Sequence, residues 1–321
     1  MKEPDFMPSD ATTTPPDFQH HEWWPRIVSG LAKILCTTAA AIALLLLFVI
    51  LGYMVWKGIG GLHWSFFTNL PLEEPMGMRN CIVGTIILAA IASLIGVPIG
   101  ILCGIYLAEY SPKGWSTAAI RLTLDVLAGT PTILFGVVVY QIVVVRPQNF
   151  NGWVGHLSLW AHRVQSWLGI TNGYSGWAGG LALALIMVPI IARATEEMLR
   201  LVPLAHREAS AGLGASKAET LWRVVLPTAK AGIITGIMLA IARVAGETAP
   251  LFFTAFGNDT MVYNPNRQMP SLTEQIYNYS QSDDPHWRAQ AWTASLVLVS
   301  MVLVFSAAVR IATRKRRIRT H

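Results

Sequence analysis

Two opposite charges, Arg243 and Glu247, stand four residues apart inside the otherwise apolar run IMLAIARVAGETAPLFF. Side chains at this spacing lie on one face of a helix, so the two are expected to be neighbours. A guanidinium binds a tetrahedral oxyanion through two parallel N–H groups. A carboxylate beside it accepts a proton from a protonated oxyanion but repels a fully deprotonated one such as sulfate. The pair therefore predicts an anion site that favours phosphate, which keeps one proton at neutral pH. An internal pair that only neutralises itself is the alternative.

The segments that must position this pair have the composition of a membrane protein. Of the 321 residues, 53% are hydrophobic and 13% are charged, against about 25% charged in soluble proteins. A helix needs about 20 apolar residues to cross the ~30 Å hydrocarbon core of a bilayer. An all-α polytopic membrane protein is therefore predicted, rather than a disordered chain, a disulfide scaffold or a nucleic-acid-binding protein. Its six expected transmembrane helices are residues 34–53, 81–106, 122–145, 177–199, 228–256 and 291–311.

The position of Arg243 within the fifth of these segments is deep. It lies 15 residues after Thr228, or about 22 Å along a helix. A charge at the bilayer centre costs about 2.5–3.5 kcal/mol on the milder scale, so such residues usually face a cavity and serve function. Pro250 removes a helical hydrogen bond to the carbonyl of Gly246 and loosens the helix beside the pair.

Lysine and arginine are distributed unevenly between the two sides of these segments. With the N-terminus inside, 17 of the 24 fall inside and 6 outside, while Arg243 lies within a segment. Positive residues concentrate on the cytoplasmic side of a membrane, so both termini are expected to be cytoplasmic. The expected domains are a polar tail at residues 1–33, a six-span domain at residues 34–311 and a basic tail at residues 312–321.

The inside loop at residues 202–227 carries the signals of two short helices. Pro203 suits the first turn of one helix. Ser216 and Glu219 form a capping box that opens a second helix, which Pro227 is expected to stop. The loop is therefore predicted to be a compact helical elbow between two spans.

The spacing in this loop resembles the EAA motif of ABC-transporter permeases, which reads EAA, three residues, Gly, nine residues and Ile-x-Leu-Pro. In this chain Ser210 replaces the second Ala and Val224 replaces the Ile. The alternative is an amphipathic elbow with no special role. The resemblance implies that the loop docks on an ATPase subunit and transmits its closure. The residues that carry the motif are Glu208, Ala209, Ser210, Gly214, Leu226 and Pro227.

Sequence motifs for catalysis are missing from the chain. It contains no Gly-Lys-Ser or Gly-Lys-Thr, and hence no Walker A phosphate loop, so ATP is expected to be hydrolysed by a partner. HExxH, GxSxG and paired metal-ligand clusters are also missing. The chain is therefore not expected to be an enzyme, or to hold a cofactor or a metal of its own.

Three further stretches resemble the phosphate permease family of the PstA type: LAGTPTILFG at residues 127–136, RATEEMLRLVP at 193–203 and ARVAGETAPL at 242–251. The resemblance implies a type I ABC importer permease with the MetI-like fold and cytoplasmic coupling helices, in the inner membrane of a bacterium. It also implies that Arg243, Glu247 and Arg193 point into the substrate pathway. The implied partners are inorganic phosphate, the lipid bilayer, a PstC-like permease, two PstB-like ATPases and an extracytoplasmic PstS-like binding protein.

The residues alone leave other functions open. A sulfate, molybdate or amino-acid permease is one, although Glu247 beside Arg243 disfavours a fully deprotonated anion. A membrane-embedded enzyme such as a lipid phosphatase would need a nucleophile or a metal cluster, and the charges within the spans disfavour a purely structural scaffold. Arg193 stands near the cytoplasmic end of its segment, where a side chain that reaches back to the interface is an equally good account.

Overall fold

A computed structural model describes residues 23–110, 114–145, 153–167, 169–170 and 173–317. In this part of the chain the regular structure is helical, and the only pairing of β type is an isolated bridge. The predicted all-α class is confirmed. The chain divides into two compact units, residues 1–53 and 54–321. The predicted tails at residues 1–22 and 318–321 lie outside the described residues.

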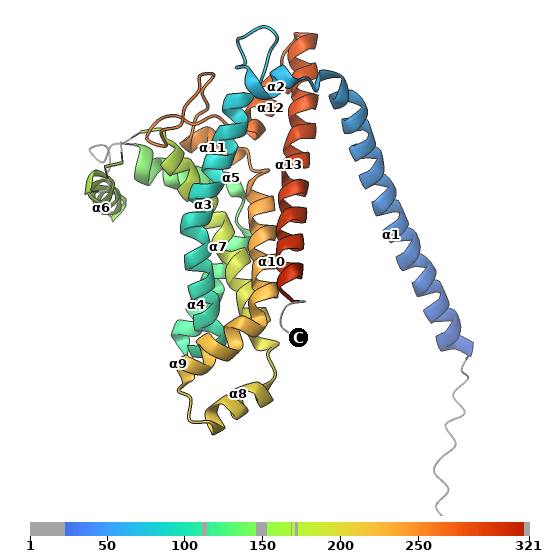
Figure 1. Ribbon diagram of the computed structural model, residues 1–321, viewed down its shortest axis with the longest axis vertical. Coiled ribbons are helices and arrows are strands. Elements are labelled where there is room, and N and C mark those ends of the chain that lie inside the picture. The colour runs from blue at the N-terminus through green and yellow to red at the C-terminus, as the bar shows by residue number, and fades with distance from the viewer. Residues whose placement is uncertain (1–22, 111–113, 146–152, 168, 171–172, 318–321) are drawn as a thin grey trace, which may run out of the picture. The chain divides into compact units, whose positions relative to one another are not determined.

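Among the described residues, five helices are long and apolar enough to cross a membrane, and two shorter helices form a bent pair that adds a sixth span if the pair is counted as one. Each of the five contains or overlaps a predicted segment, although α1 begins about ten residues earlier than expected. The five are α1 (Trp23–Gly58), α3 (Arg79–Ile105), α7 (Gly176–Arg200), α10 (Leu226–Val244) and α13 (Pro285–Arg317) (Figure 1).

The third predicted span is not one helix. It consists of α4 (Trp115–Gly129) and α5 (Thr132–Val139), whose directions differ by 105°. Pro131 carries no N–H group and disfavours helical geometry in the residue before it, and Thr130 is accordingly extended, with ψ 134°. A continuous span over residues 122–145 is therefore the wrong description, since proline breaks it near its middle.

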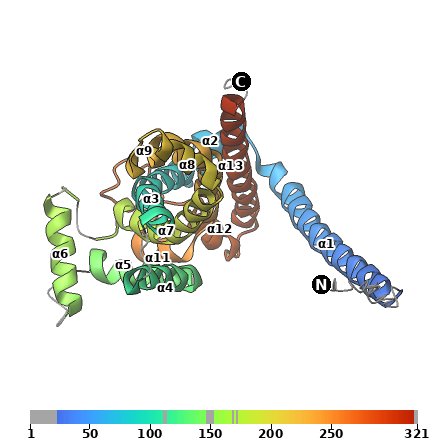
Figure 2. The ribbon, with the colours of Figure 1, turned by 90° about the horizontal axis from the view of Figure 1, so that it is seen from below.

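The centre of the larger unit is a pair of parallel helices, α3 and α7, which lie side by side in both views (Figures 1 and 2). Glycines of α3 recur every four residues along the contact. A Cβ atom at Gly100 would lie 2.7 Å from the Cβ of Ile191, and one at Gly104 would lie 2.6 Å from the carbonyl oxygen of Ala192. The small residues therefore let the two backbones approach closely, as expected for helices in a membrane.

The fifth predicted span is also interrupted. Helix α10 ends at Val244, and a short helix, α11 (Ala249–Thr254), follows after a turn. Pro250 lies in the first turn of α11, where its missing N–H group costs nothing. The prediction of one helix over residues 228–256 is thus wrong: proline here opens a second helix rather than only loosening the first.

The short helices gather at the two ends of the larger unit. Helices α8 (Leu204–Gly212) and α9 (Lys217–Thr220) lie at one end, and α2 (Trp64–Thr68) and α12 (Leu272–Ser280) lie at the other (Figure 1). Helix α13 runs from the end with α12 towards the end with α8 and α9. The remaining helix is α6 (Trp153–Trp167).

Candidate anion pathway and coupling surface

Arg243 lies at mid-depth of the helical unit. Helix α10 packs against α7 with Gly236 opposite Ala194. Arg243 stands seven residues beyond Gly236, which is about 10 Å further along the helix. The next residue, Val244, belongs to the same apolar cluster as Met187, which lies near the middle of α7. Arg243 therefore lies level with the middle of α7.

The predicted partners Arg243 and Glu247 meet at the end of α10, not on one helix face. Arg243 is in the last turn of the helix, and Glu247 follows in the break. Their closest approach, from Nη2 to Oε1, is 3.9 Å, which is beyond hydrogen-bond length. The Arg243 side chain is 53% exposed and that of Glu247 is 15% exposed. In this single chain the Arg243 side chain is therefore about half exposed.

The break that contains Glu247 is bonded to α12. The hydroxyl group of Thr273, on α12, donates a hydrogen bond of 2.9 Å to the carbonyl oxygen of Glu247. This bond satisfies a backbone group that the interrupted helix leaves without its usual partner. Helix α12 thereby holds the backbone of Glu247 beside the end of α10.

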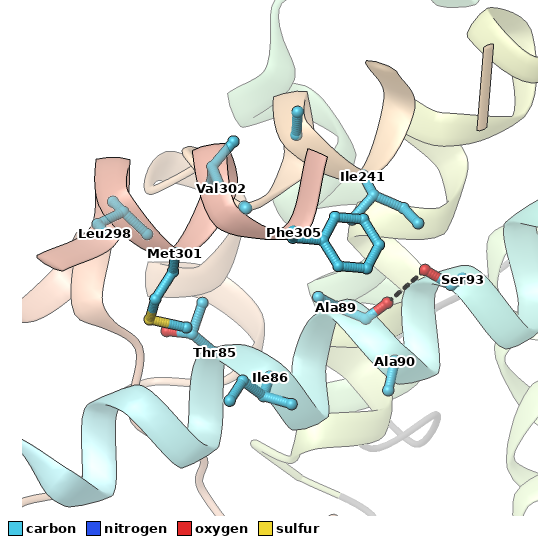
Figure 3. Close-up of a pocket in the computed structure, with 12 residues that line it drawn as sticks. Thr85, Ile86, Ala89, Ala90, Ser93, Ile241, Leu298, Met301, Val302 and Phe305 are labelled. Carbon is cyan, nitrogen blue, oxygen red and sulfur yellow. Dashed lines mark hydrogen bonds between the residues drawn. The ribbon is translucent and has the colours of Figure 1, made fainter. Parts of the chain in front are cut away.

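A pocket of about 320 Å³ lies beside this break, between α3, α10 and α13 (Figure 3). Its lining is apolar, with Ile241, Met301 and Phe305 among its residues. The Ser93 hydroxyl that lines it donates to the carbonyl oxygen of Ala89 at 2.7 Å. The pocket offers no charged group to an anion. Across the described ranges, no three His, Cys, Asp or Glu side chains are placed to hold a metal.

Arg193, the other predicted pathway residue, is engaged in ion pairs. It binds Asp125 of α4 and lies 3.6 Å, from Nη1 to Oε2, from Glu196 of its own helix. Along α7 it lies seven residues nearer to the end that carries α8 and α9 than Ile186, which clusters with Val244. These pairs place Arg193 and Arg243 in different groups of charges.

A charged network around Glu196 was not foreseen from the sequence. The Glu196 side chain is only 4% exposed and binds Arg121 as well as Arg200, the latter at 2.8 Å. Three arginines with Asp125 and Glu196 leave one net positive charge at the junction of α4 and α7. The partners are separated by up to 75 residues in sequence. The spacings of Arg193, Glu196 and Arg200, three and four residues apart on one helix, could have indicated the part of this network that lies within α7.

The elbow of residues 202–227 has the predicted pair of helices. The Ser216 and Glu219 capping box is present, with the Ser216 N–H donating to Glu219 Oε2 at 2.9 Å. Gly214 turns the chain at φ +83°, a conformation that favours glycine. The motif residues Glu208 and Ala209 are exposed on α8.

Pro227 does not stop the second helix of the elbow. Helix α9 continues through a wide turn of π type, Leu221–Val225, directly into α10, where Pro227 occupies the first turn. In the wide turn the N–H of Leu226 bonds to the carbonyl of Leu221, five residues back. In a regular α-helix the proline ring clashes with the carbonyl group four residues earlier. A π turn displaces that carbonyl group, so the helix can continue past the proline. The second helix of the elbow and α10 are therefore one continuous helical segment.

One acidic residue at the opposite end, Glu274 of α12, also escaped the sequence analysis. It is buried, and this burial, together with the charge of Asp259, raises the pKa of its carboxyl group to about 7. Gly257, at φ +58°, passes close to it, because a Cβ atom there would lie 2.6 Å from Glu274 Oε1. No local sequence pattern signals a carboxyl group in this environment.

Comparison with known proteins agrees with this architecture. The phosphate transport system permease protein PstA of Yersinia pestis is 36% identical, covering 92% of this chain and 92% of its own length. PstA 1 of Mycobacterium tuberculosis (strain ATCC 25618 / H37Rv) is 33% identical over 91% of each chain.

Solved structures show the same fold at low identity. A bacterial ABC transporter involved in the import of the acidic polysaccharide alginate superposes with a TM-score of 0.59, at 14% identity, over 90% of this chain and 99% of that one. The methionine ABC transporter MetNI, in an inward-facing conformation, gives 0.52 at 18% identity, over 78% and 100%. The expected type I permease fold is thereby confirmed. Residues 96–318 match the family model described as binding-protein-dependent transport system inner membrane component, and the chain therefore belongs to that family.

Proposed function

We propose that this chain is the transmembrane permease subunit of an ATP-driven importer of inorganic phosphate and forms half of the translocation pathway. The observation that carries the proposal is Arg243, a cation at mid-depth whose guanidinium is half-exposed and only loosely paired with Glu247. A guanidinium in this state offers its N–H fork to an oxyanion, and the carboxylate accepts the proton that phosphate retains. Relatives named for phosphate transport cover about nine-tenths of the chain.

The proposed partners are those that would cover the exposed side of Arg243 and bind the elbow. The outward face of Arg243 would be covered by a homologous permease subunit of the PstC type. The elbow at residues 202–227 would dock on one of two PstB-like ATPase subunits, which hydrolyse the ATP, so the chain itself acts as no enzyme and holds no cofactor. An extracytoplasmic binding protein of the PstS type would deliver phosphate to the end that carries α12.

The proposed location is the inner membrane of a bacterium, with both termini in the cytoplasm. The end that carries α8 and α9 would face the cytoplasm, consistent with the inside excess of Lys and Arg. The six-span domain would occupy residues 34–311, between a polar tail at residues 1–33 and a basic tail at residues 312–321.

Arg193 has a different place in this proposal. It would lie on the pathway at the inner side of Arg243, where its bonds to Asp125 and Glu196 hold it until an anion arrives. The net positive charge of this network would favour passage of an anion towards the cytoplasm.

Uptake of labelled phosphate into vesicles that hold the chain with its partners tests the proposal. Uptake should depend on ATP inside and resist competition by sulfate or molybdate. Arg79→Gln, which alters an arginine outside the proposed pathway, serves as the control and should transport normally. Efficient competition by sulfate would indicate a permease for another oxyanion. Release of phosphate from a lipid without ATP would indicate a membrane-embedded enzyme.

A further inference from the structure

The elbow is tied to the second span by a buried ion pair. Arg207 of α8 binds the carboxylate of Glu109, which lies in the wide π turn Tyr106–Tyr110 at the inner end of α3. The side chains are 22% and 8% exposed, so solvent screens this pair less than a surface pair. The residues are 98 positions apart in sequence, and no motif connects them.

The same arginine also reaches the fourth span. Arg207 Nη2 donates a hydrogen bond of 2.7 Å to the carbonyl oxygen of Leu199, in the last turn of α7. Lys217, which opens α9, donates to the backbone carbonyl of Glu109 at 2.5 Å and lies 4.9 Å above the ring of Tyr110. Both helices of the elbow are therefore bonded to the inner end of α3.

Covalent connectivity makes this tie important. The elbow is continuous in sequence with α7 on one side and, through the π turn, with α10 on the other. Helix α3 has no such connection, and it reaches the elbow through polar contacts at Glu109 and through an apolar cluster that contains Ile105, Leu199 and Leu221. Apolar contacts permit sliding, whereas a bidentate or charge-assisted bond fixes direction.

We propose that the Arg207–Glu109 pair is the link through which movement of the elbow displaces α3 and α7 as one body. Helices α3 and α7 are packed through close glycine contacts, so a displacement at their inner ends is carried to the level of the anion site. This inference rests on the proposed function in one respect, that the elbow receives the movement of an ATPase. Arg207 and Glu109 are positioning residues, because neither contacts the anion or the nucleotide.

Neutral substitution at each end of the pair tests this link. In vesicles that hold the full complex, Glu109→Gln and Arg207→Gln should each retain the ATPase subunit and continue to hydrolyse ATP. The amount of phosphate moved per ATP should fall about tenfold, within the range of typical coupling between sites. Matched controls are Glu197→Gln and Lys230→Gln, exposed charges on α7 and α10 near the same end, which should keep the normal ratio.

Two results would overturn the link. A normal ratio of phosphate to ATP in both variants would show that coupling does not pass through the pair. Loss of the ATPase subunit from the complex would show that the pair only maintains the shape of the docking surface. If the wild-type complex carries another anion, the proposed substrate is wrong, but the same ratio is then measured with that anion and the link is tested independently.

A covalent replacement of the ion pair gives a second test, in which the same variant complex is compared before and after cross-linking. Glu109→Cys and Arg207→Cys are combined in a chain whose three native cysteines are changed to serine. Before cross-linking, this complex should hydrolyse ATP with little transport, and a short thiol-reactive cross-linker should restore transport per ATP. A complex that couples equally well in both states, or that remains uncoupled after cross-linking, would contradict the proposal.

Discussion

At the scale of single residues, the two arginines expected on the pathway differ in how well they are paired. Arg193 binds two carboxylates, Asp125 and Glu196, and its donors are largely engaged. Arg243 has one carboxylate, Glu247, at 3.9 Å and keeps its donors available. Arg243 is therefore the better primary anion site, and Arg193 is expected to act only after it exchanges a partner.

The shape of the Arg243 side chain should affect transport separately from its charge. Arg243→Lys keeps the positive charge but loses the planar fork that binds two oxygens at once. We expect phosphate uptake to fall about ten- to hundredfold, the equivalent of one lost charge-assisted hydrogen bond. Initial rates in vesicles measure this, and an Arg243→Lys complex with full activity would show that charge alone suffices.

Glu274 should make stability depend on pH. Its pKa is raised from 4.5 to about 7 in the folded protein, so the folded state keeps a proton that the unfolded chain releases. Stability from this group is therefore present below the unfolded pKa and is lost as the pH rises through about 7. Glu274→Gln should reduce the fall in melting temperature between about pH 5 and about pH 8. A fall as large as in the wild type would contradict this assignment.

At the scale of elements, the π turns and helix breaks determine which helices are continuous and where they end. The π turn Leu221–Val225 joins the elbow to α10, and the break after Val244 ends that helix at the level of the anion site. A movement received at α9 can therefore travel along one continuous helical segment to Arg243, and α8 is joined to that segment through the turn at Gly214. Helices α3 and α7 follow through the Arg207–Glu109 link.

The turn between α8 and α9 should be sensitive to side chains because of its backbone geometry. Gly214 has φ +83°, and nothing lies within 4 Å of a Cβ atom placed there. Gly214→Val should therefore strain the turn without a steric clash, and the complex should lose ATP hydrolysis coupled to transport. Gly212→Val is the matched control, since Gly212 also has open space but no positive φ. Equal behaviour of the two variants would show that the turn geometry is unimportant.

The sequence predicts the spans well and their interruptions poorly. Apolar length locates the five long helices and the bent pair of α4 and α5. The effect of a proline cannot be predicted from the residues around it. Pro131 separates two helices whose directions differ by 105°, whereas Pro227 lies within the unbroken helical segment Lys217–Val244. The outcome depends on neighbouring helices, as does the pairing of Glu109 with Arg207.

At the scale of the whole molecule, the two ends of the larger unit differ in chemistry. The end with α8 and α9 presents exposed apolar side chains, among them Leu204 and Leu213. The end with α12 carries the buried carboxylate of Glu274. The proposed anion site at Arg243 lies between the two ends, which is the arrangement that a transporter driven from one side and loaded from the other requires.

The orientation of these ends can be measured by labelling. In a chain without native cysteines, single cysteines at Ser216 and Ser280 lie at opposite ends of the larger unit. A thiol reagent that cannot cross the membrane should react from outside with position 280 and not with position 216. Reaction at position 216 with protection of position 280 would reverse the topology.

The most direct test of the account is phosphate uptake by the double variant Arg243→Gln/Glu247→Gln, compared with Arg243→Gln. If Arg243 binds the anion in transit, both variants should fail to import phosphate while the complex remains assembled and hydrolyses ATP. If the pair is only structural, Arg243→Gln alone leaves Glu247 without its partner, and removing both charges should restore the protein. Recovery of uptake in the double variant would therefore contradict the proposed anion site.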